Sequence, residues 1–159
     1  MTLPKELTLN VSIDGLPLHN RSPETFWPIL INVHEIPLVS PMTVAIFHGV
    51  SKAPSVEEFL RPFVSELNEL AESGLTINKM LHEVKVRAVI ADASARAFVK
   101  GVANFNAKHG CLKRTCIGEY NSSSRTVVFN SVDAPLRTDS LFRQSAYGEH
   151  HKHPSPLLD

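Results

Sequence analysis

The sequence has little of several features that mark whole classes of protein. Two cysteines among 159 residues are too few for a disulfide-built scaffold and suit a reducing compartment, so we expect a nuclear or cytoplasmic protein. No apolar run reaches the roughly 18 residues of a membrane-spanning helix, and the first residues lack the pattern of a secretory signal. A glycine-rich phosphate loop and a dinucleotide-binding fingerprint are also missing. We therefore expect no membrane partner and no nucleotide-loop enzyme.

The formal net charge of the chain is zero, but the first half is acidic and the second half is basic. Residues 1–84 carry 5 Lys or Arg against 10 Asp or Glu, whereas residues 85–159 carry 11 against 6. A basic half is compatible with binding a polyanion such as DNA, although an ordinary solvated surface can have the same composition. The hydrophobic content of 43% fits one globular domain with a real core.

The hydrophobic pattern of the first half predicts three strands joined by short turns. Residues 7–13 alternate between apolar and polar side chains, as a half-buried strand does. Residues 26–33 and 42–47 are the next candidates, and Pro28 favours an edge position or a bulge for the first of these two. The short connections predict an antiparallel meander.

The period then changes to that of a helix. Ser55 and Glu58 have the spacing of a capping box, and apolar residues recur every three or four positions over 55–72, up to Gly74. Pro62 inside this stretch is expected to kink the helix or to leave a carbonyl unpaired.

A fourth strand and a second helix follow. Residues 82–91 become continuously apolar, which predicts a central strand covered on both faces, and residues 93–103 are rich in alanine. The long helix before this strand allows a crossover to a parallel neighbour. The expected fold is therefore α/β and RNase H-like: a mixed sheet with a three-strand meander, a crossover helix and a parallel fourth strand.

Two aspartates occupy matching positions in this topology. Asp14 follows the first strand and Asp92 follows the fourth, and these strands are neighbours in an RNase H-like sheet. Paired carboxylates bind Mg²⁺ or Mn²⁺, and such metals support in-line phosphoryl transfer. Taken singly, Asp14 also fits the start of an Asp-Gly turn, and Asp92 fits a helix N-cap.

Several short motifs resemble a known family. Residues 12–18 (SIDGLPL) and 26–29 (FWPI) resemble the first acidic motif of cut-and-paste DNA transposases of the CACTA and Kyakuja-Dileera-Zisupton type. Later matches keep the same order over nearly the whole chain, at 49–59, 91–98, His109, Cys111, Cys116, 136–143 and 150–157.

The resemblance implies the first part of a transposase core, with Asp14 and Asp92 as the first two acids of a catalytic triad. It also implies DNA and a homo-oligomer as partners. The core would span 1–130, with a cysteine-bearing insertion at about 104–120, and a loop-like His- and Pro-rich tail would span 131–159. Because the third acid is expected beyond residue 159, we expect a truncated or domesticated transposase-like protein, DNA-associated but inactive alone. An active fragment of a longer product and a remnant without function are the alternatives.

A zinc site is the second expectation from the resemblance. The family typically has Cys-x-x-Cys after the second aspartate, but here Arg114 stands at the second cysteine position and Cys116 comes two residues later. A pair of thiolates at Cys111 and Cys116 still suits tetrahedral zinc. The remaining ligands would come from the tail histidines, His150, His151 or His153. Two free thiols and a solvated tail are the alternative.

Basic residues near these motifs are the candidate DNA contacts. Arg96 and Lys100 share one face of the second expected helix, and Lys108, Lys113 and Arg114 lie in the insertion. Each can contact a phosphate, and each can equally be an ordinary solvated side chain.

Overall fold

The computed structural model describes residues 3–19 and 23–159, and the chain folds into two compact units. The sheet unit spans Met1–Asp92 and the cysteine unit spans Ala93–Asp159. In the described residues, no helix has both the length and the apolar character needed to cross a bilayer.

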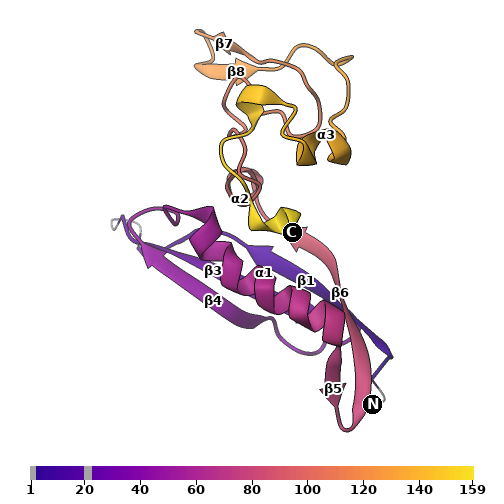
Figure 1. Ribbon diagram of the computed structural model, residues 1–159. Helices are drawn as coiled ribbons and strands as arrows, with labels where there is room; N and C mark the ends of the chain where they lie inside the picture. Colours follow the sequence, from indigo (N-terminus) through magenta and orange to yellow (C-terminus); the bar gives the residue numbers. More distant parts are fainter. Residues whose placement is uncertain (1–2, 20–22) are drawn as a thin grey trace. The chain divides into compact units, whose positions relative to one another are not determined.

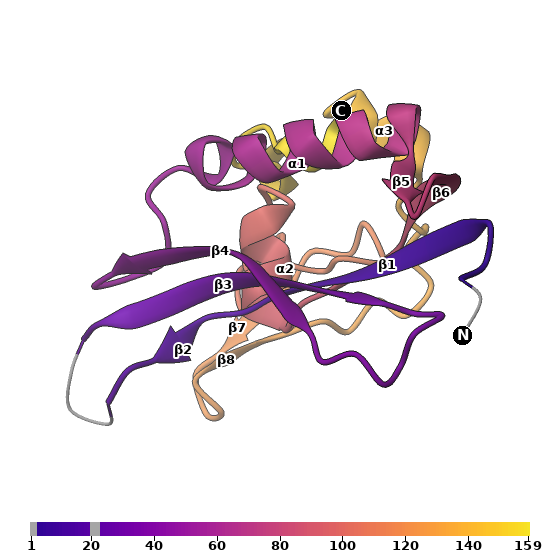
Figure 2. The same ribbon diagram turned by 90° about the horizontal axis from the view of Figure 1, so that it is seen from below.

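The sheet unit contains one mixed sheet and one long helix (Figures 1 and 2). Strand β1 pairs antiparallel with β3 and parallel with β6, and β3 also pairs antiparallel with β4. The predicted antiparallel meander and the parallel fourth strand are therefore confirmed, as is the α/β class. The elements are β1 (Glu6–Ile13), β2 (Leu16–Pro17), β3 (Thr25–Val33), β4 (Met42–Gly49), α1 (Val56–Ser73), β5 (Leu75–Ile77) and β6 (Met80–Ile90).

The core lies between α1 and one face of the sheet. The alternating residues of β1 divide as the sequence predicts, because every second side chain is buried, and Val11 and Ile13 are fully so. Helix α1 contributes Leu60 and Phe63 from its apolar stripe. Figure 2 shows this helix lying across the strands on one side only.

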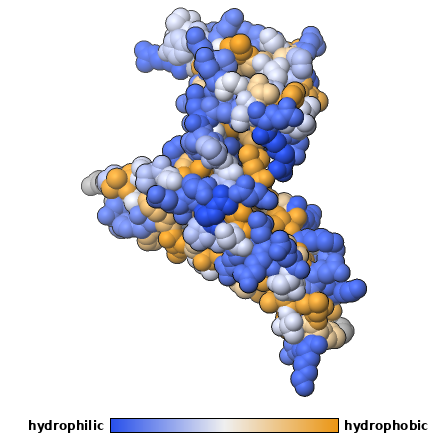
Figure 3. Space-filling view, in the orientation of Figure 1, coloured by the Kyte–Doolittle hydropathy of each residue, from blue (hydrophilic) through white to orange (hydrophobic). Residues whose placement is uncertain are grey.

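Helix α1 begins and ends where the sequence predicts. The Ser55 hydroxyl accepts a hydrogen bond from the Glu58 amide at 3.1 Å, and the Gly74 amide donates to the Leu70 carbonyl at 2.9 Å. Pro62 lies on the exposed face of the continuous helix, where the Glu58 carbonyl that loses its donor can meet water. This outward face is mostly hydrophilic, with apolar residues along its flanks (Figure 3).

Strand β3 is an interior strand, so the edge position predicted from Pro28 is wrong. The pairing with β1 ends at Ile29, one residue after Pro28, so the missing N–H falls where that ladder has stopped. The pairing with β4 shifts register between Ile29 and Leu30, which is the irregularity that a proline in a strand favours.

Strand β6 is less covered than its apolar sequence predicts. Val86, Val89 and Ile90 are each more than two-fifths exposed, so the expected strand buried on both faces is not observed. Within the described residues of the sheet unit α1 is the only helix, so the sheet has a helical layer on one face, and β5 borders β6 only from Met80 to His82.

The cysteine unit is built from short elements held by backbone hydrogen bonds. They are α2 (Ala93–Val99), β7 (Glu119–Asn121), β8 (Thr126–Val128), α3 (Asp139–Arg143) and the 3₁₀ helices η1 (Gly148–His150) and η2 (Pro156–Leu158). Helix α2 ends earlier than the predicted 93–103, because Gly101 adopts a left-handed φ of 64°.

The last 29 residues belong to this unit, whereas the sequence predicts a separate loop-like tail over 131–159. The Ala103 amide donates to the His150 carbonyl at 2.8 Å, and the Lys152 amide donates to the Gly101 carbonyl at 2.8 Å. Phe142 packs with Ala97 and Val102 in a small apolar core. The tail is thereby ordered by the segment that follows α2.

Candidate functional site

The strand register brings the two candidate aspartates to the same edge of the sheet. Ser12 on β1 is the register partner of Ile90 on β6, and Asp14 and Asp92 each follow two residues later. Neighbouring strands lie about 4.8 Å apart, so parallel strands in this register deliver both residues to one region. Both side chains are exposed, as a site open to a large substrate requires.

The turn after β1 is fixed by close packing beneath it. A Cβ atom on Gly15 would lie 2.9 Å from the ring carbons Cε2 and Cζ2 of Trp27, so only glycine fits there. Trp27 itself is only 9% exposed, so its ring belongs to the buried core beneath this turn. The Asp14 carboxylate accepts a hydrogen bond from the Gly15 amide at 2.8 Å through one oxygen, and its second oxygen can bind a cation.

A third carboxylate does not join this pair. Over residues 3–19 and 23–159, no group of three or more His, Cys, Asp or Glu side chains has the arrangement that would hold a metal ion. The chemistry of two exposed carboxylates suits a hard divalent cation, but two ligands bind it weakly.

The two cysteines of the second candidate site are in contact. The Cys111 sulfur accepts a hydrogen bond from the Arg114 amide at 3.4 Å and interacts with the Cys116 thiol. Burial raises the pKa of Cys111, but the hydrogen bonds from the Arg114 and Lys113 amides and from Cys116 outweigh this effect, so that its pKa lies below the usual range. Burial and the neighbouring Cys111 raise the pKa of Cys116. Cys111 therefore loses its proton more readily than an ordinary cysteine, and more readily than Cys116.

The two histidines of the same candidate site also lie together. The ring centroids of His150 and His151 are 5.8 Å apart, and two imidazoles on one tetrahedral zinc would be roughly 5–6 Å apart. His150 contacts the His109 carbonyl through Nδ1 at 2.6 Å, and the Nε2 atoms of both rings are buried without a hydrogen-bond partner. Burial lowers the pKa of both residues, which keeps them neutral, as a metal ligand must be.

The four expected zinc ligands thus form a thiol pair and an imidazole pair. In the described part of the chain these pairs do not converge into a closed metal cluster. The positive charge of Arg137 acts on all four groups and favours a lower pKa at each, although burial and Cys111 keep the pKa of Cys116 raised. The types of donor fit zinc, and the two orphaned Nε2 atoms are the observation that favours a ligand there.

The candidate DNA contacts differ in their surroundings. Arg96, Lys108 and Lys113 are exposed. Arg114 is partly buried, and its Nη1 donates to the Ala134 carbonyl at 2.7 Å, which removes it from the set of solvated cations. Lys100 is also partly buried, and its ammonium lies 4.9 Å from the centre of the Phe142 ring.

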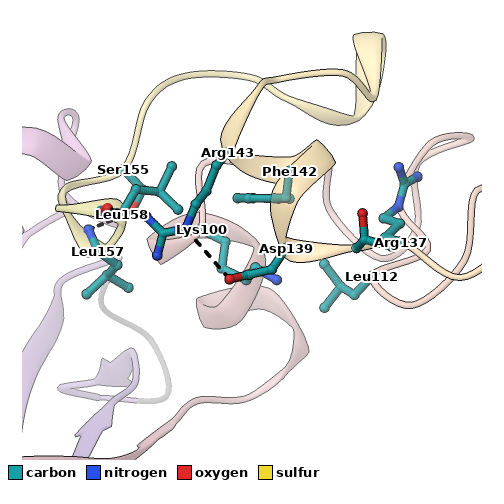
Figure 4. Close-up of a pocket in the computed structure, with 10 residues that line it drawn as sticks. Lys100, Leu112, Arg137, Asp139, Phe142, Arg143, Ser155, Leu157 and Leu158 are labelled. Atoms are coloured by element: carbon teal, nitrogen blue, oxygen red, sulfur yellow. Dashed lines mark hydrogen bonds and ion pairs between the residues drawn. The ribbon is translucent and has the colours of Figure 1, made fainter.

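Sequence reasoning missed the residues that surround Lys100. A cavity of about 270 Å³ joins it to Arg137, Asp139, Phe142 and Arg143 (Figure 4). In this view Arg143 reaches toward Asp139, with a distance of 3.6 Å between Nε and Oδ2. No sequence signal links these positions, because about 40 residues separate Lys100 from α3, where the hydrophobic pattern is weak.

Comparison with known proteins adds no assignment. No family model matches the chain, and no curated protein matches it either.

Proposed function

We propose that this chain carries the first part of an RNase H-like core of a cut-and-paste DNA transposase. In this proposal residues 1–159 associate with DNA and perform no phosphoryl transfer alone. Asp14 and Asp92 are the first two acidic residues of the metal site. The nucleus or the cytoplasm is the compartment that the two free cysteines suit.

One observation carries the proposal, namely the register of β1 against β6. The strand order β4-β3-β1-β6 has two antiparallel pairs followed by one parallel pair, which is the order expected of an RNase H-like sheet. Ser12 and Ile90 are partners in that parallel pair, so the aspartate two residues beyond each is delivered to one edge.

The two carboxylates would hold Mg²⁺ or Mn²⁺, which supplies positive charge to the oxygens of a phosphate under attack. Their mutual repulsion at close range favours a cation between them. Phosphoryl transfer needs tight positioning, and a displacement of about 1 Å can cost roughly a hundredfold in rate. With two carboxylate ligands and no third among the described residues, we propose weak metal binding without turnover.

A titration with Mn²⁺ tests this site. Paramagnetic broadening in the NMR spectrum is expected at residues 12–15 and 90–93 together, because one ion would lie near both strand ends. Asp14→Asn and Asp92→Asn should each reduce the broadening at both ends by about tenfold or more, since each removes a charged ligand. Asparagine at position 14 keeps an oxygen that can accept the Gly15 amide, and asparagine at position 92 is as suitable as aspartate before a helix.

The matched control is Asp133→Asn, an exposed aspartate in the cysteine unit. This variant is expected to leave the broadening unchanged. Broadening confined to one strand end, or identical in all four proteins, would remove the metal site from the proposal.

We propose, as a second candidate function, that the cysteine unit binds zinc through Cys111, Cys116, His150 and His151. The orphaned Nε2 atoms of the two histidines support this proposal. The His109 carbonyl that contacts Nδ1 of His150 would orient the ring and direct Nε2 toward the ion. A bound zinc ion would draw the thiol pair and the imidazole pair together and stabilise the unit.

Zinc affinity measured by competition with a chromophoric chelator checks this proposal. The protein is expected to bind weakly, and His150→Ala should weaken binding by about tenfold or more. Arg114→Cys should raise the affinity, because the Arg114 amide already contacts the Cys111 sulfur and a third thiolate would stand there.

His153→Ala is the control and should leave the zinc affinity unchanged, because the His153 side chain is exposed and its Nδ1 contacts the carbonyl of the next residue, Pro154. Equal affinities for the unmodified protein, His150→Ala and Arg114→Cys would refute the zinc proposal. Stoichiometric zinc in the purified protein would show that Arg114 does not weaken the site.

A further inference from the structure

The cysteine unit contains a second cavity, which includes His151 of the zinc candidate but neither of its cysteines nor His150. It has a volume of about 350 Å³ and adjoins the cavity of Figure 4, with which it shares Lys100, Phe142, Arg143 and Leu158. We call it the Lys100 pocket. Its other lining residues are Ser145, His151, Lys152, His153 and Pro154.

The charged side chains that line this pocket are all basic, and the carboxylate that contacts Arg143, that of Asp139, lies in the adjoining cavity. Lys100, Arg143 and Lys152 line it, and no Asp or Glu does. Among the residues that the structure describes, neither lysine ammonium makes a hydrogen bond or an ion pair. Burial lowers the pKa of Lys100, and the charge of Asp139, which lines the adjoining cavity, offsets only part of this effect.

The Arg143 side chain is held by two contacts that use only some of its N–H donors. Its Nη1 donates to the Leu158 carbonyl at 2.6 Å, and its Nε lies 3.6 Å from Asp139 in the adjoining cavity. A guanidinium has five N–H donors in a planar fork, so further donors can serve a ligand. These two contacts orient the side chain before any ligand arrives.

We propose that the Lys100 pocket binds a phosphate group. Three cations in one cavity match a dianion better than a single carboxylate, and the fork of an arginine fits the oxygens of a phosphate. The Phe142 ring and Pro154 provide an apolar wall for the group that carries the phosphate, and the volume admits a phosphate with a sugar-sized substituent. The phosphate can come from a free monoester or from a nucleic-acid backbone.

This site is separate from Asp14 and Asp92, so its test and the Mn²⁺ titration can fail independently. Inorganic phosphate is the first probe, measured by calorimetry at low ionic strength. Lys100→Met should weaken binding by about tenfold or more, because it removes a charged donor but keeps a side chain that can pack on Phe142. Lys152→Met should also weaken it, by several-fold, because this lysine is more exposed.

Arg125→Met is the matched control, an exposed cation of the same unit that neither lines the pocket nor belongs to the candidate DNA contacts. We expect it to bind phosphate like the unmodified protein. Lys100→Arg tests whether a loss in Lys100→Met reflects misfolding, because it restores the charge and should recover most of the affinity. No phosphate binding at millimolar concentration, or equal losses in Lys100→Met and Arg125→Met, would overturn the proposal.

Two further probes distinguish the sources of the phosphate. Ribose 5-phosphate that competes with inorganic phosphate, while a short single-stranded oligonucleotide does not, would assign the pocket to a free monoester. An oligonucleotide that competes, and that loses affinity in Lys100→Met, would assign it to a nucleic-acid backbone.

Discussion

Gly101→Ala is expected to destabilise the cysteine unit by about 3 kcal/mol or more. Gly101 adopts a φ of 64°, and an added Cβ would lie 2.2 Å from the His153 carbonyl oxygen. Two costs therefore add: a left-handed backbone for a residue with a side chain, and a clash with backbone that cannot move away freely. The Gly101 carbonyl also accepts hydrogen bonds from the Lys152 and His153 amides, so a shift at Gly101 would release the last segment.

Gly148→Ala separates these two costs. Gly148 also has a positive φ, of 51°, but a Cβ there would meet nothing within 4 Å. Gly148→Ala should lower the free energy of unfolding of the cysteine unit by only about 1 kcal/mol, because only the left-handed backbone conformation is unfavourable there. Hydrogen exchange measured by mass spectrometry reports each unit: residues 93–159 should lose protection in Gly101→Ala far more than in Gly148→Ala. Equal losses in the two variants would show that the contact with His153 does not hold the segment.

DNA binding is expected to be weak and to fall steeply with salt. The cysteine unit has nine Lys or Arg against five Asp or Glu. If it neutralises about three phosphates, the affinity should fall roughly 40-fold between about 50 and 200 mM NaCl, from a starting value in the non-specific range of about 10⁻⁴ to 10⁻⁶ M. Fluorescence anisotropy of a labelled duplex at several salt concentrations measures both quantities.

Exposed lysines should account for this slope. The double variant Lys108→Met/Lys113→Met is expected to reduce it, whereas Lys79→Met, in the turn between β5 and β6, should leave it unchanged. Supercoiled plasmid with Mn²⁺ should stay uncut. Cleavage that Asp92→Asn abolishes would instead favour an active fragment, and no binding at low salt would favour a remnant without function.

The sheet unit could be predicted from sequence because its signals are periodic and local. The strict alternation of 7–13 and the capping box at Ser55 and Glu58 each specify an element by themselves. The strand order then followed from connection lengths, and with it the shared edge for Asp14 and Asp92. The exposure of β6 could not be read in this way, because an apolar run is the same whether or not a second layer covers it.

The cysteine unit was harder to predict because its order comes from distant pairs of residues. The Ser155 hydroxyl donates to the Val99 carbonyl, 56 residues earlier in the chain, and the Val102–His151 bridge spans a similar distance. Contacts between residues this far apart produce no periodic pattern of apolar residues in the sequence, so the sequence of 131–159 predicts a loop. The zinc candidates were named from a resemblance, but their division into a thiol pair and an imidazole pair was visible only in the folded chain.

The parallel pairing of β1 with β6 has a consequence for synthesis on the ribosome. Thr8 pairs with Lys85, a residue 77 positions later, as do Asn10 and Arg87 through their side chains. At about 5–20 residues per second, β1 must therefore wait roughly 4–15 s after its own emergence before its partner is made. During that interval β3 can protect only one edge of β1, and the other edge displays unpaired backbone groups and invites pairing with another nascent chain. Yield in cells thus depends on how quickly β6 emerges and on whether a chaperone covers that edge first.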